Sequence, residues 1–292
     1  MYFLYQKQFK YIDCILFRQN NLIFKVDKMN KENIIEVNEL NKSYGKLQVL
    51  KDVNFSVKKK SIFAFLGPNG AGKSTTIKIL TTILQPDTGK VLINGNNPLK
   101  DSDKVRKDFG IVFQDPSVDE ELTAYENLDM HGIFYRVPKN ERKKRIEELM
   151  KIVELWDRKD ELVKNFSGGM KRRLEIARGL LHYPKVLFLD EPTVGLDPQT
   201  RNHIWDYIKK VNKREGTTIF FTTHYMDEAE KYADSIAIID HGKIIDIGTS
   251  KELIKKTKTK TLEEAFIKIT GYSIRDEEAS TLDRMRMMRR RH

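Results

Sequence analysis

The chain has 292 residues, of which 39% are hydrophobic and 33% charged, with a single cysteine and a formal net charge of +11. These proportions are those of a folded globular protein and exclude the disordered and fibrous classes. No apolar stretch approaches the roughly 20 residues that a membrane-spanning helix needs, so we expect any attachment to a membrane to come through another protein.

Most of the positive charge lies at the two ends of the chain. Residues 1–28 carry +3 and residues 284–292 carry +5, so the body retains too little positive charge for a nucleic-acid-binding surface. Residues 1–28 show no sustained hydrophobic period, and Met29 stands just before the first clear strand, so we expect residues 1–32 to form an N-terminal extension. Met29 is therefore a candidate translation start, and both an artefactual extension and a functional arm stay open for the residues before it. Cys14 has no second cysteine with which to pair, which fits a reducing cytoplasm.

The first elements of the body are strands. Residues Ile34–Leu40 and Val53–Val57 alternate apolar and polar side chains, which predicts strands with one buried face. Residues Ile62–Leu66 form a continuous apolar run that ends at a glycine, which predicts a buried strand of a parallel sheet. Apolar residues at helical spacing follow at Ile77 and Leu80, so a strand, a loop and a helix come in succession.

The middle of the chain, about residues 116–182, has mainly helical spacing. Pro138 separates one predicted helix from a charged one, and Gly168 opens a third. The charged run Lys139–Glu148 mixes both signs at helical spacing, and we interpret it as a solvent-exposed helix face without a function of its own. The helices interrupt the succession of strands as an insertion.

Strands and helices then alternate again. The apolar strand Val186–Leu189 is followed by a helix near Pro198–Arg214 and by the strand Thr218–Phe221. After a short helix, residues Ile236–Asp240 and Lys243–Ile247 flank a His-Gly turn in a hairpin pattern. Alternating strands and helices predict an α/β fold with a mostly parallel sheet.

A phosphate-binding pattern lies between a predicted buried strand and the helix after it, as this chemistry requires. The pattern G-x-x-x-x-G-K-S-T consists of Gly67, Pro68, Asn69, Gly70, Ala71, Gly72, Lys73, Ser74 and Thr75. Its glycines let backbone N–H groups point at phosphates, and the helix N-terminus adds a partial positive charge. We expect Lys73 to contact the β- and γ-phosphates of a nucleotide and Ser74 to bind Mg2+.

A later apolar strand delivers Asp190 and Glu191 to the edge of the sheet where ligands bind in α/β folds. Acidic residues at a strand end often only cap the next helix, but the phosphate loop in the same chain favours a catalytic pair. We expect Asp190 to hold Mg2+ and Glu191 to polarise the water that attacks the γ-phosphate. A second helix start suited to phosphate follows Phe166, at Ser167, Gly168 and Gly169.

The order of these features resembles the ABC ATPase cassette over about Ile34–Ile254. Besides the phosphate loop, the Ser-Gly-Gly helix start and the Asp-Glu strand end, the resemblance includes Gly195-Leu196-Asp197-Pro198 and His224. It implies a P-loop NTPase fold with a mostly parallel sheet core, an N-terminal antiparallel β subdomain and a helical insertion that carries the signature motif. It places the ATPase domain at residues 33–258, its helical part at about 116–182, and a family-specific extension at 259–292.

The resemblance assigns further residues. Tyr44 looks like the aromatic residue that stacks on adenine, and Gln114 like the glutamine that links Mg2+ to the transporter interface. His224 looks like the switch histidine that contacts the γ-phosphate. In this family the Ser-Gly-Gly helix start caps the ATP bound by a second subunit, and Asp197 lies at the dimer seam. Two ATP molecules would therefore join two chains head to tail.

The signature motif departs from the common family form at Phe166 and Met170, where Leu and Gln are usual. The departure weakens any hydrogen bond assigned to the fifth side chain and leaves the backbone contacts expected. Thr261–Phe266 and Gly271–Ala279, together with Phe113–Ser117, resemble drug-exporter ATPases of the daunorubicin-resistance type. That resemblance implies a homodimer at the cytoplasmic face of the cell membrane, which powers export of a drug, antibiotic, lipid or polysaccharide through a separate integral-membrane permease.

Other classes stay open. A soluble ABC ATPase acting on ribosomes or DNA usually has two cassettes or a long coiled-coil insertion, whereas this chain has one phosphate loop and no sustained heptads. An importer ATPase is disfavoured by the C-terminal resemblance. A catalytically silent dimer is disfavoured because Lys73, Asp190, Glu191 and His224 are all present. We therefore expect ATP and Mg2+ as cofactors and no nucleic acid as a partner.

Overall fold

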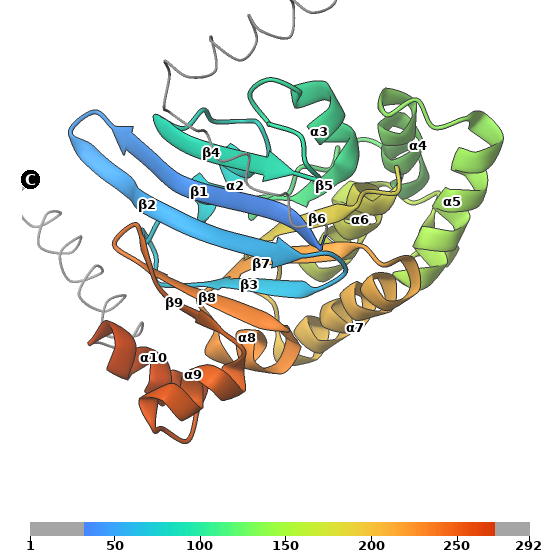
Figure 1. Ribbon diagram of the computed structural model, residues 1–292. Helices are drawn as coiled ribbons and strands as arrows, with labels where there is room; N and C mark the ends of the chain where they lie inside the picture. The colour runs from blue at the N-terminus through green and yellow to red at the C-terminus, as the bar shows by residue number, and fades with distance from the viewer. Residues whose placement is uncertain (1–31, 272–292) are drawn as a thin grey trace, which may run out of the picture. The chain divides into compact units, whose positions relative to one another are not determined.

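The structure is a computed structural model that describes residues 32–271 (Figure 1). The predictions for residues 1–31, those on Cys14 and Met29 included, and for residues 272–292 lie outside the described part of the chain. The described part contains two β-sheets, with helices packed against them.

Three strands form an antiparallel sheet in the order β2-β1-β4. They are β1 (Asn33–Tyr44), β2 (Leu47–Lys58) and β4 (Thr88–Ile93). The first two strands are longer than predicted because their pairing continues until Tyr44 meets Leu47 across a two-residue turn. The antiparallel N-terminal subdomain expected from the family resemblance is confirmed.

Six strands form the second sheet, in the order β5-β6-β7-β3-β8-β9. The first five are parallel, and β9 pairs with β8 as the predicted antiparallel hairpin. The mostly parallel sheet predicted from the alternation of strands and helices is confirmed. The strands are β3 (Ile62–Leu66), β5 (Phe109–Val112), β6 (Val186–Asp190), β7 (Thr218–Thr223), β8 (Ser235–Asp240) and β9 (Lys243–Gly248).

The parallel sheet separates two apolar cores because neighbouring residues of a strand point to opposite faces. In β3, Ile62, Ala64 and Leu66 belong to one core, and Phe63 and Phe65 belong to the other. Helices α7 (Pro198–Glu215), α8 (Met226–Tyr232), α9 (Ser250–Thr257) and α10 (Leu262–Thr270) contribute to the first core. The antiparallel sheet contributes to the second, together with α2 (Lys73–Leu80) and α3 (Ser102–Asp108). Both faces of β3 are thus covered, which accounts for its uninterrupted apolar sequence.

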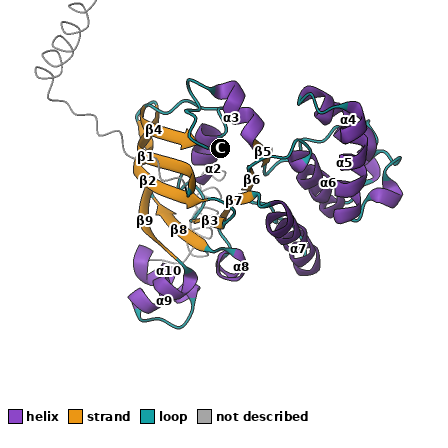
Figure 2. Cartoon of the chain, turned by 45° about the vertical axis from the view of Figure 1, so that its right-hand side comes forward, coloured by secondary structure: helices purple, strands orange, loops and turns teal. Residues whose placement is uncertain are grey.

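The helical insertion lies between β5 and β6 in the chain, and Figure 2 shows its three α-helices grouped to one side of the sheets. The first helix begins at a capping box formed by Thr123 and Glu126, and the second begins directly after Pro138, where the break was predicted. The elements are α4 (Ala124–Phe134), α5 (Lys139–Ile152), the short 3₁₀ helices η1 (Trp156–Arg158) and η2 (Val163–Asn165), and α6 (Gly168–Leu180).

The charged run Lys139–Glu148 of α5 is partly buried, so its interpretation as a solvent-exposed face was wrong. Arg142 is buried and pairs with Asp129 of α4 at 2.6 Å. Arg145 is buried as well and pairs with Glu215 of α7 at 2.7 Å. A buried cation needs a partner of opposite charge, and both partners come from other helices. The run therefore ties α5 to its neighbours.

Several elements were not predicted, among them β4, α3, β5, α9 and α10, and α3 and β5 are the shortest of these five. β5 has four residues and pairs with β6 alone, and α3 has seven residues with Val105 as its buried residue. Such elements are too short to display a hydrophobic period. In the C-terminal part, α10 buries Leu262 and Phe266 in the first core, so this segment packs on the cassette itself.

Candidate functional site

The phosphate loop connects β3 to α2 at the carboxyl end of the parallel strands. Gly72 caps α2 with a φ of +105°, and a Cβ at this position would lie 2.6 Å from Cδ2 of Leu50. The N–H of Gly67 donates to the carbonyl of Thr223 at 3.2 Å, which holds the start of the loop against the end of β7. The path of the loop therefore requires glycine at position 72.

The ammonium group of Lys73 lies inside this loop. The residue is 4% exposed, and its Nζ donates to the carbonyl oxygens of Gly67 at 2.8 Å and Pro68 at 3.0 Å. The same Nζ lies 3.2 Å from Oε1 of Glu191. A cation is thus held where the loop meets the end of β6.

Asp190 is tied to two neighbouring segments through one carboxylate oxygen. Its Oδ1 accepts a hydrogen bond from Oγ1 of Thr222 at 2.6 Å and from Oγ of Ser74 at 3.3 Å. Thr222, on the adjacent strand β7, also accepts a hydrogen bond from the N–H of Glu191 at 3.0 Å. One threonine therefore fixes both members of the acidic pair, a role that the sequence analysis missed.

Glu191 directs its two carboxylate oxygens at two different partners. Oε1 faces Lys73, and Oε2 lies 3.3 Å from Nδ1 of His224. Burial on its own would raise the pKa of Glu191, but the close contact with the His224 ring and the charge of Lys73 outweigh burial and lower the pKa below its usual value. The side chain is therefore a carboxylate at neutral pH, with a backbone φ of +48° that a non-glycine residue rarely adopts.

The structure thus brings together Lys73, Ser74, Asp190, Glu191 and His224, which the sequence placed on three separate segments. Parallel strands deliver their carboxyl ends to the same edge of the sheet, and β6, β7 and β3 are direct neighbours. The predicted convergence of the loop and the acidic pair follows from this strand order.

The Ser-Gly-Gly helix start lies at the beginning of α6. Ser167 caps the helix, and its Oγ accepts a hydrogen bond from the N–H of Met170 at 3.3 Å. A Cβ at Gly169 would lie 2.7 Å from Cγ2 of Thr200, so α6 approaches α7 closely here. Phe166 and Met170, the two departures from the common motif, are both buried and serve the packing of this chain. Asp197 caps α7 in the same way and accepts a hydrogen bond from the N–H of Thr200 at 3.0 Å.

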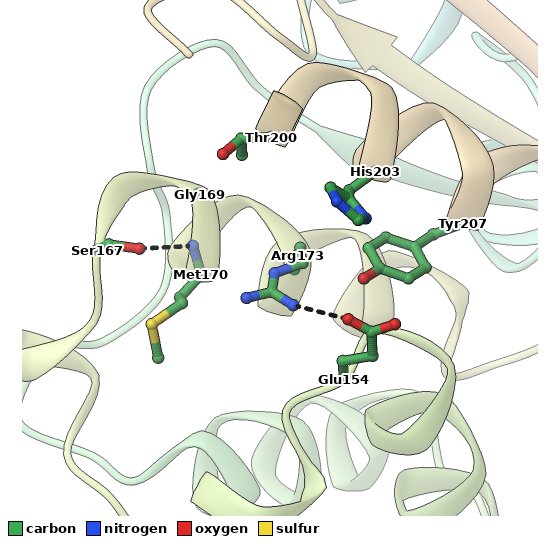
Figure 3. A pocket seen from close by; sticks show the side chains of 8 residues that line it. All are labelled: Glu154, Ser167, Gly169, Met170, Arg173, Thr200, His203 and Tyr207. Atoms are coloured by element: carbon green, nitrogen blue, oxygen red, sulfur yellow. Dashed lines mark hydrogen bonds and ion pairs between the residues drawn. The ribbon is translucent and has the colours of Figure 1, made fainter. Parts of the chain in front are cut away.

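A pocket of about 200 Å³ opens between these two helix starts. In Figure 3, Arg173 extends from α6 toward Glu154, near the ring of Tyr207. Arg173 also donates to the carbonyl of Val153 at 3.0 Å. The lining side chains come from Glu154, Ser167, Gly169, Met170, Arg173, Thr200, His203 and Tyr207.

Tyr44 and Gln114 lie on the exposed surface. Tyr44 ends β1 and is 48% exposed, and Gln114 follows β5 with an exposed side chain. Such exposure leaves both side chains accessible to a ligand or to another protein, and their roles remain predictions.

A further residue that the sequence analysis missed is Arg172 of α6, which is buried and donates hydrogen bonds to backbone carbonyls beside Gln114 and Glu191. The available signal was the spacing of Arg172 and Glu175, an opposite-charge pair three residues apart on a helix. That spacing alone does not reveal the carbonyl partners, which come from distant parts of the chain.

The side-chain oxygens at the loop suit the coordination of a magnesium ion that is bound together with phosphate. Mg2+ is usually held by one or two protein oxygens and completes its shell with phosphate and water. Ser74 Oγ and Asp190 Oδ1 are two such donors, 3.3 Å apart. Among residues 32–271, no group of three or more His, Cys, Asp or Glu side chains could hold a metal without such help.

Comparison with known proteins points to one family. Residues 50–194 match the protein family described as ABC transporter. The linearmycin resistance ATP-binding protein LnrL of Bacillus subtilis is 42% identical over 76% of this chain and 71% of its own length. The daunorubicin/doxorubicin resistance ATP-binding protein DrrA of Streptomyces peucetius is 43% identical over 75% of this chain and 66% of its own length, just under two thirds.

Solved structures agree as well. The dimeric post-hydrolysis state of the ATP-binding cassette MJ0796, bound to ADP and Pi, matches with a TM-score of 0.67 and 30% identity over 74% of this chain and 98% of that one. Within residues 32–271, no helix combines the length and the apolar character that crossing a bilayer requires.

Proposed function

The chain belongs to the ABC transporter family as an ATP-binding subunit, and from this premise we propose that it hydrolyses ATP to drive export through a separate membrane-spanning permease. The observation that carries the proposal is the position of Glu191, whose carboxylate lies between Lys73 of the phosphate loop and His224. A carboxylate held ionised beside a phosphate loop is suited to activate water.

ATP binds with its phosphates inside the loop of residues 67–75, where backbone N–H groups and the start of α2 favour negative charge. Lys73 contacts the β- and γ-phosphates, which compete with Glu191 for its ammonium group. Tyr44 stacks on the adenine ring. Ser74, Asp190 and Gln114 are the residues that would hold Mg2+, which when bound neutralises phosphate charge.

Hydrolysis transfers the γ-phosphoryl group of ATP to water, with ADP as the leaving group. Glu191 accepts a hydrogen bond from the attacking water and so orients its oxygen toward the γ-phosphorus, while the bond to the bridging oxygen of ADP breaks. The His224 ring has two nitrogen atoms: Nδ1 faces the carboxylate of Glu191, and Nε2 would donate a hydrogen bond to the γ-phosphate. Thr222 keeps Asp190 and Glu191 in register during this step.

We propose a homodimer in which two ATP molecules join the chains head to tail. Ser167 and Gly168 are exposed at the start of α6, where N–H groups are available to a phosphate from another molecule. They would cap the ATP bound by the partner, together with Gly169, and Asp197 would lie at the seam. The dimeric ADP-bound cassette among the solved structures supports the formation of a dimer.

The permease would contact the surface near Gln114 and the helical insertion, at the cytoplasmic face of the membrane. Apolar side chains of α4 are exposed on this insertion: Met130, Ile133 and Phe134. Closure of the ATP dimer and its reopening after hydrolysis would move this surface and so drive the permease mechanically. The drug-resistance names of LnrL and DrrA support export over import, with a drug, antibiotic, lipid or polysaccharide as cargo.

The experiment compares Mg2+-dependent ATP hydrolysis and ATP-dependent dimer formation for the full chain and for Glu191→Gln. We expect the variant to lose at least about 10²-fold in turnover, because it removes the water-orienting carboxylate, and to accumulate as an ATP-bound dimer. Glu147→Gln is the matched control, since Glu147 is an exposed carboxylate of α5. Normal hydrolysis by Glu191→Gln, with both proteins monomeric, would refute the site assignment.

A further inference from the structure

One buried guanidinium group connects the helix that begins at the signature motif to both catalytic segments. Arg172 lies on α6 and is 7% exposed. Its Nη2 donates to the carbonyls of Asp190 at 3.0 Å and Glu191 at 3.1 Å, and its Nε donates to the carbonyl of Pro192 at 2.7 Å. Three successive carbonyls, from the last residue of β6 onward, therefore accept hydrogen bonds from a single side chain.

These contacts determine the shape of the turn that carries Glu191. A φ of +48° is unfavourable for a glutamate, so the turn needs support from its surroundings. Arginine offers five N–H donors in a fixed plane, which suits several carbonyls at once. The guanidinium thus binds the backbone carbonyl of Glu191, while Lys73 and His224 contact its side-chain carboxylate.

The same helix also holds the segment that carries Gln114. Nη1 of Arg172 donates to the carbonyl of Phe113, immediately before Gln114. Oε1 of Glu175 accepts hydrogen bonds from the N–H of Ser117 at 2.6 Å and from its Oγ at 3.1 Å. Arg172 and Glu175 pair with each other at 3.2 Å. The two residues of this ion pair therefore bind both ends of the segment 113–117 by hydrogen bonds.

We propose that Arg172 is a positioning residue for hydrolysis, which sets Glu191 and the Gln114 segment relative to the helix that begins at Ser167. A displacement of α6 when an ATP dimer closes would then be passed to the water-activating carboxylate and to the Gln114 segment together. This inference rests on the proposed ATPase function, but it concerns a residue outside the nucleotide and metal contacts assigned above.

A second buried arginine, Arg145, is the control that distinguishes a positioning role in hydrolysis from a purely structural role. Arg145 of α5 is 2% exposed, and its partners are Glu148, Glu215 and the carbonyl of Leu180. These partners belong to the packing of α5, α6 and α7. Replacing either arginine with lysine keeps the charge and removes the planar set of donors.

The test measures kcat and KM for ATP, and the melting temperature, for Arg172→Lys and Arg145→Lys in the full chain. We expect Arg172→Lys to lower kcat about 10²-fold, as for a misplacement of about 1 Å, while KM for ATP stays within about twofold. Arg145→Lys should lower the melting temperature and leave kcat within about twofold of wild type. A drop in melting temperature without a drop in kcat for Arg172→Lys would overturn the proposal.

If Arg172→Lys does not fold, Arg172→Gln combined with Glu175→Gln removes both buried charges together and avoids an unpaired one. The double variant should bind ATP like wild type and hydrolyse it about 10²-fold more slowly. Wild-type kcat in this variant would reject the positioning role. Failure of the proposed function is a separate result, in which the wild-type chain itself shows no ATP hydrolysis.

Discussion

The two parts of the candidate site that would enclose a nucleotide lie in different surroundings. The phosphate-loop part contains Lys73, Asp190 and Glu191, which are 4%, 5% and 8% exposed. Lys73 pairs with Glu191, and Thr222 joins Glu191 to Asp190 by hydrogen bonds within the same chain. The signature part contains Ser167 and Gly168, which lie exposed at a helix start. The first part is assembled by folding, whereas the second lies at the surface, where the partner of the proposed dimer would contact it.

This difference has an energetic consequence. Buried ionised groups depend on one another, so a change in one should alter both stability and chemistry. An exposed helix start makes few contacts inside its own chain, so a change there should alter chemistry and leave stability intact. The two parts can therefore be told apart by measuring turnover and the free energy of unfolding on the same variants.

The largest effect is expected for Lys73→Met. Turnover should fall about 10²–10³-fold, because a cation that contacts the transferred phosphate is lost. The free energy of unfolding should fall by about 3 kcal/mol, because Glu191 is left as a buried carboxylate without its cation. Urea denaturation and steady-state ATP hydrolysis measure the two quantities.

Lys73→Met combined with Glu191→Gln is the control for this prediction. Removing both charges should restore most of the lost stability and leave the enzyme inactive. If the double variant is as unstable as Lys73→Met alone, the ion pair is not the source of the loss and the two parts of the site do not differ as argued.

The next effect is expected for Gly168→Asp at the start of α6. A Cβ at this position meets no atom within 4 Å, and a carboxylate in the first turn of a helix is favourable. The free energy of unfolding should therefore change by less than about 0.5 kcal/mol. Turnover and ATP-dependent dimerisation should fall about 10²-fold, because the new charge repels the phosphates of the partner's ATP.

Asn140→Asp adds the same charge at the exposed first turn of α5 and should change neither stability nor turnover. Wild-type turnover in Gly168→Asp would contradict the proposed head-to-tail dimer. A large loss of stability in the same variant would contradict the view that this part of the site is independent of the fold.

The sequence could predict those features of the fold and the site that depend on a local pattern of residues. The strand Ile62–Leu66 was identified because burial on both faces leaves an uninterrupted apolar run, and the loop pattern follows it directly. The convergence of the loop with Asp190 then follows from parallel strand order. Features that depend on local pattern were accessible, and β5 was missed because its four residues carry no period.

Contacts made by long side chains with distant backbone were not accessible. Arg145 belongs to a charged helix that looks solvent-exposed in the sequence, yet it is buried against Glu215 of α7. Arg172 reaches carbonyls 18 to 59 residues away. Sequence spacing records neighbours along a helix, and it contains no information on partners that tertiary packing brings together.

A smaller effect is expected for Tyr44→Ala, an exposed residue outside the buried part of the site. Loss of base stacking should raise KM for ATP about tenfold, since stacking on an aromatic ring contributes about 1–3 kcal/mol. kcat should stay at the wild-type value, because Tyr44 would contact adenine and not the reacting phosphate. Tyr44→Phe keeps the ring and should behave like wild type, whereas an unchanged KM in Tyr44→Ala would remove this residue from the adenine site.

The last prediction concerns pH and tests how far the buried part acts as a unit. The close contact with the His224 ring is one of the causes that lower the pKa of Glu191, so His224→Ala should raise that pKa. Because the carboxylate is the active form, residual kcat/KM of His224→Ala should decline at a higher pH on the acid side than in wild type. His241→Ala, which removes an exposed histidine, should leave the profile in place. An acid limb that stays put or moves to lower pH in His224→Ala would mean that Lys73 alone keeps Glu191 ionised, and that the histidine lies beside the catalytic carboxylate without influencing its protonation.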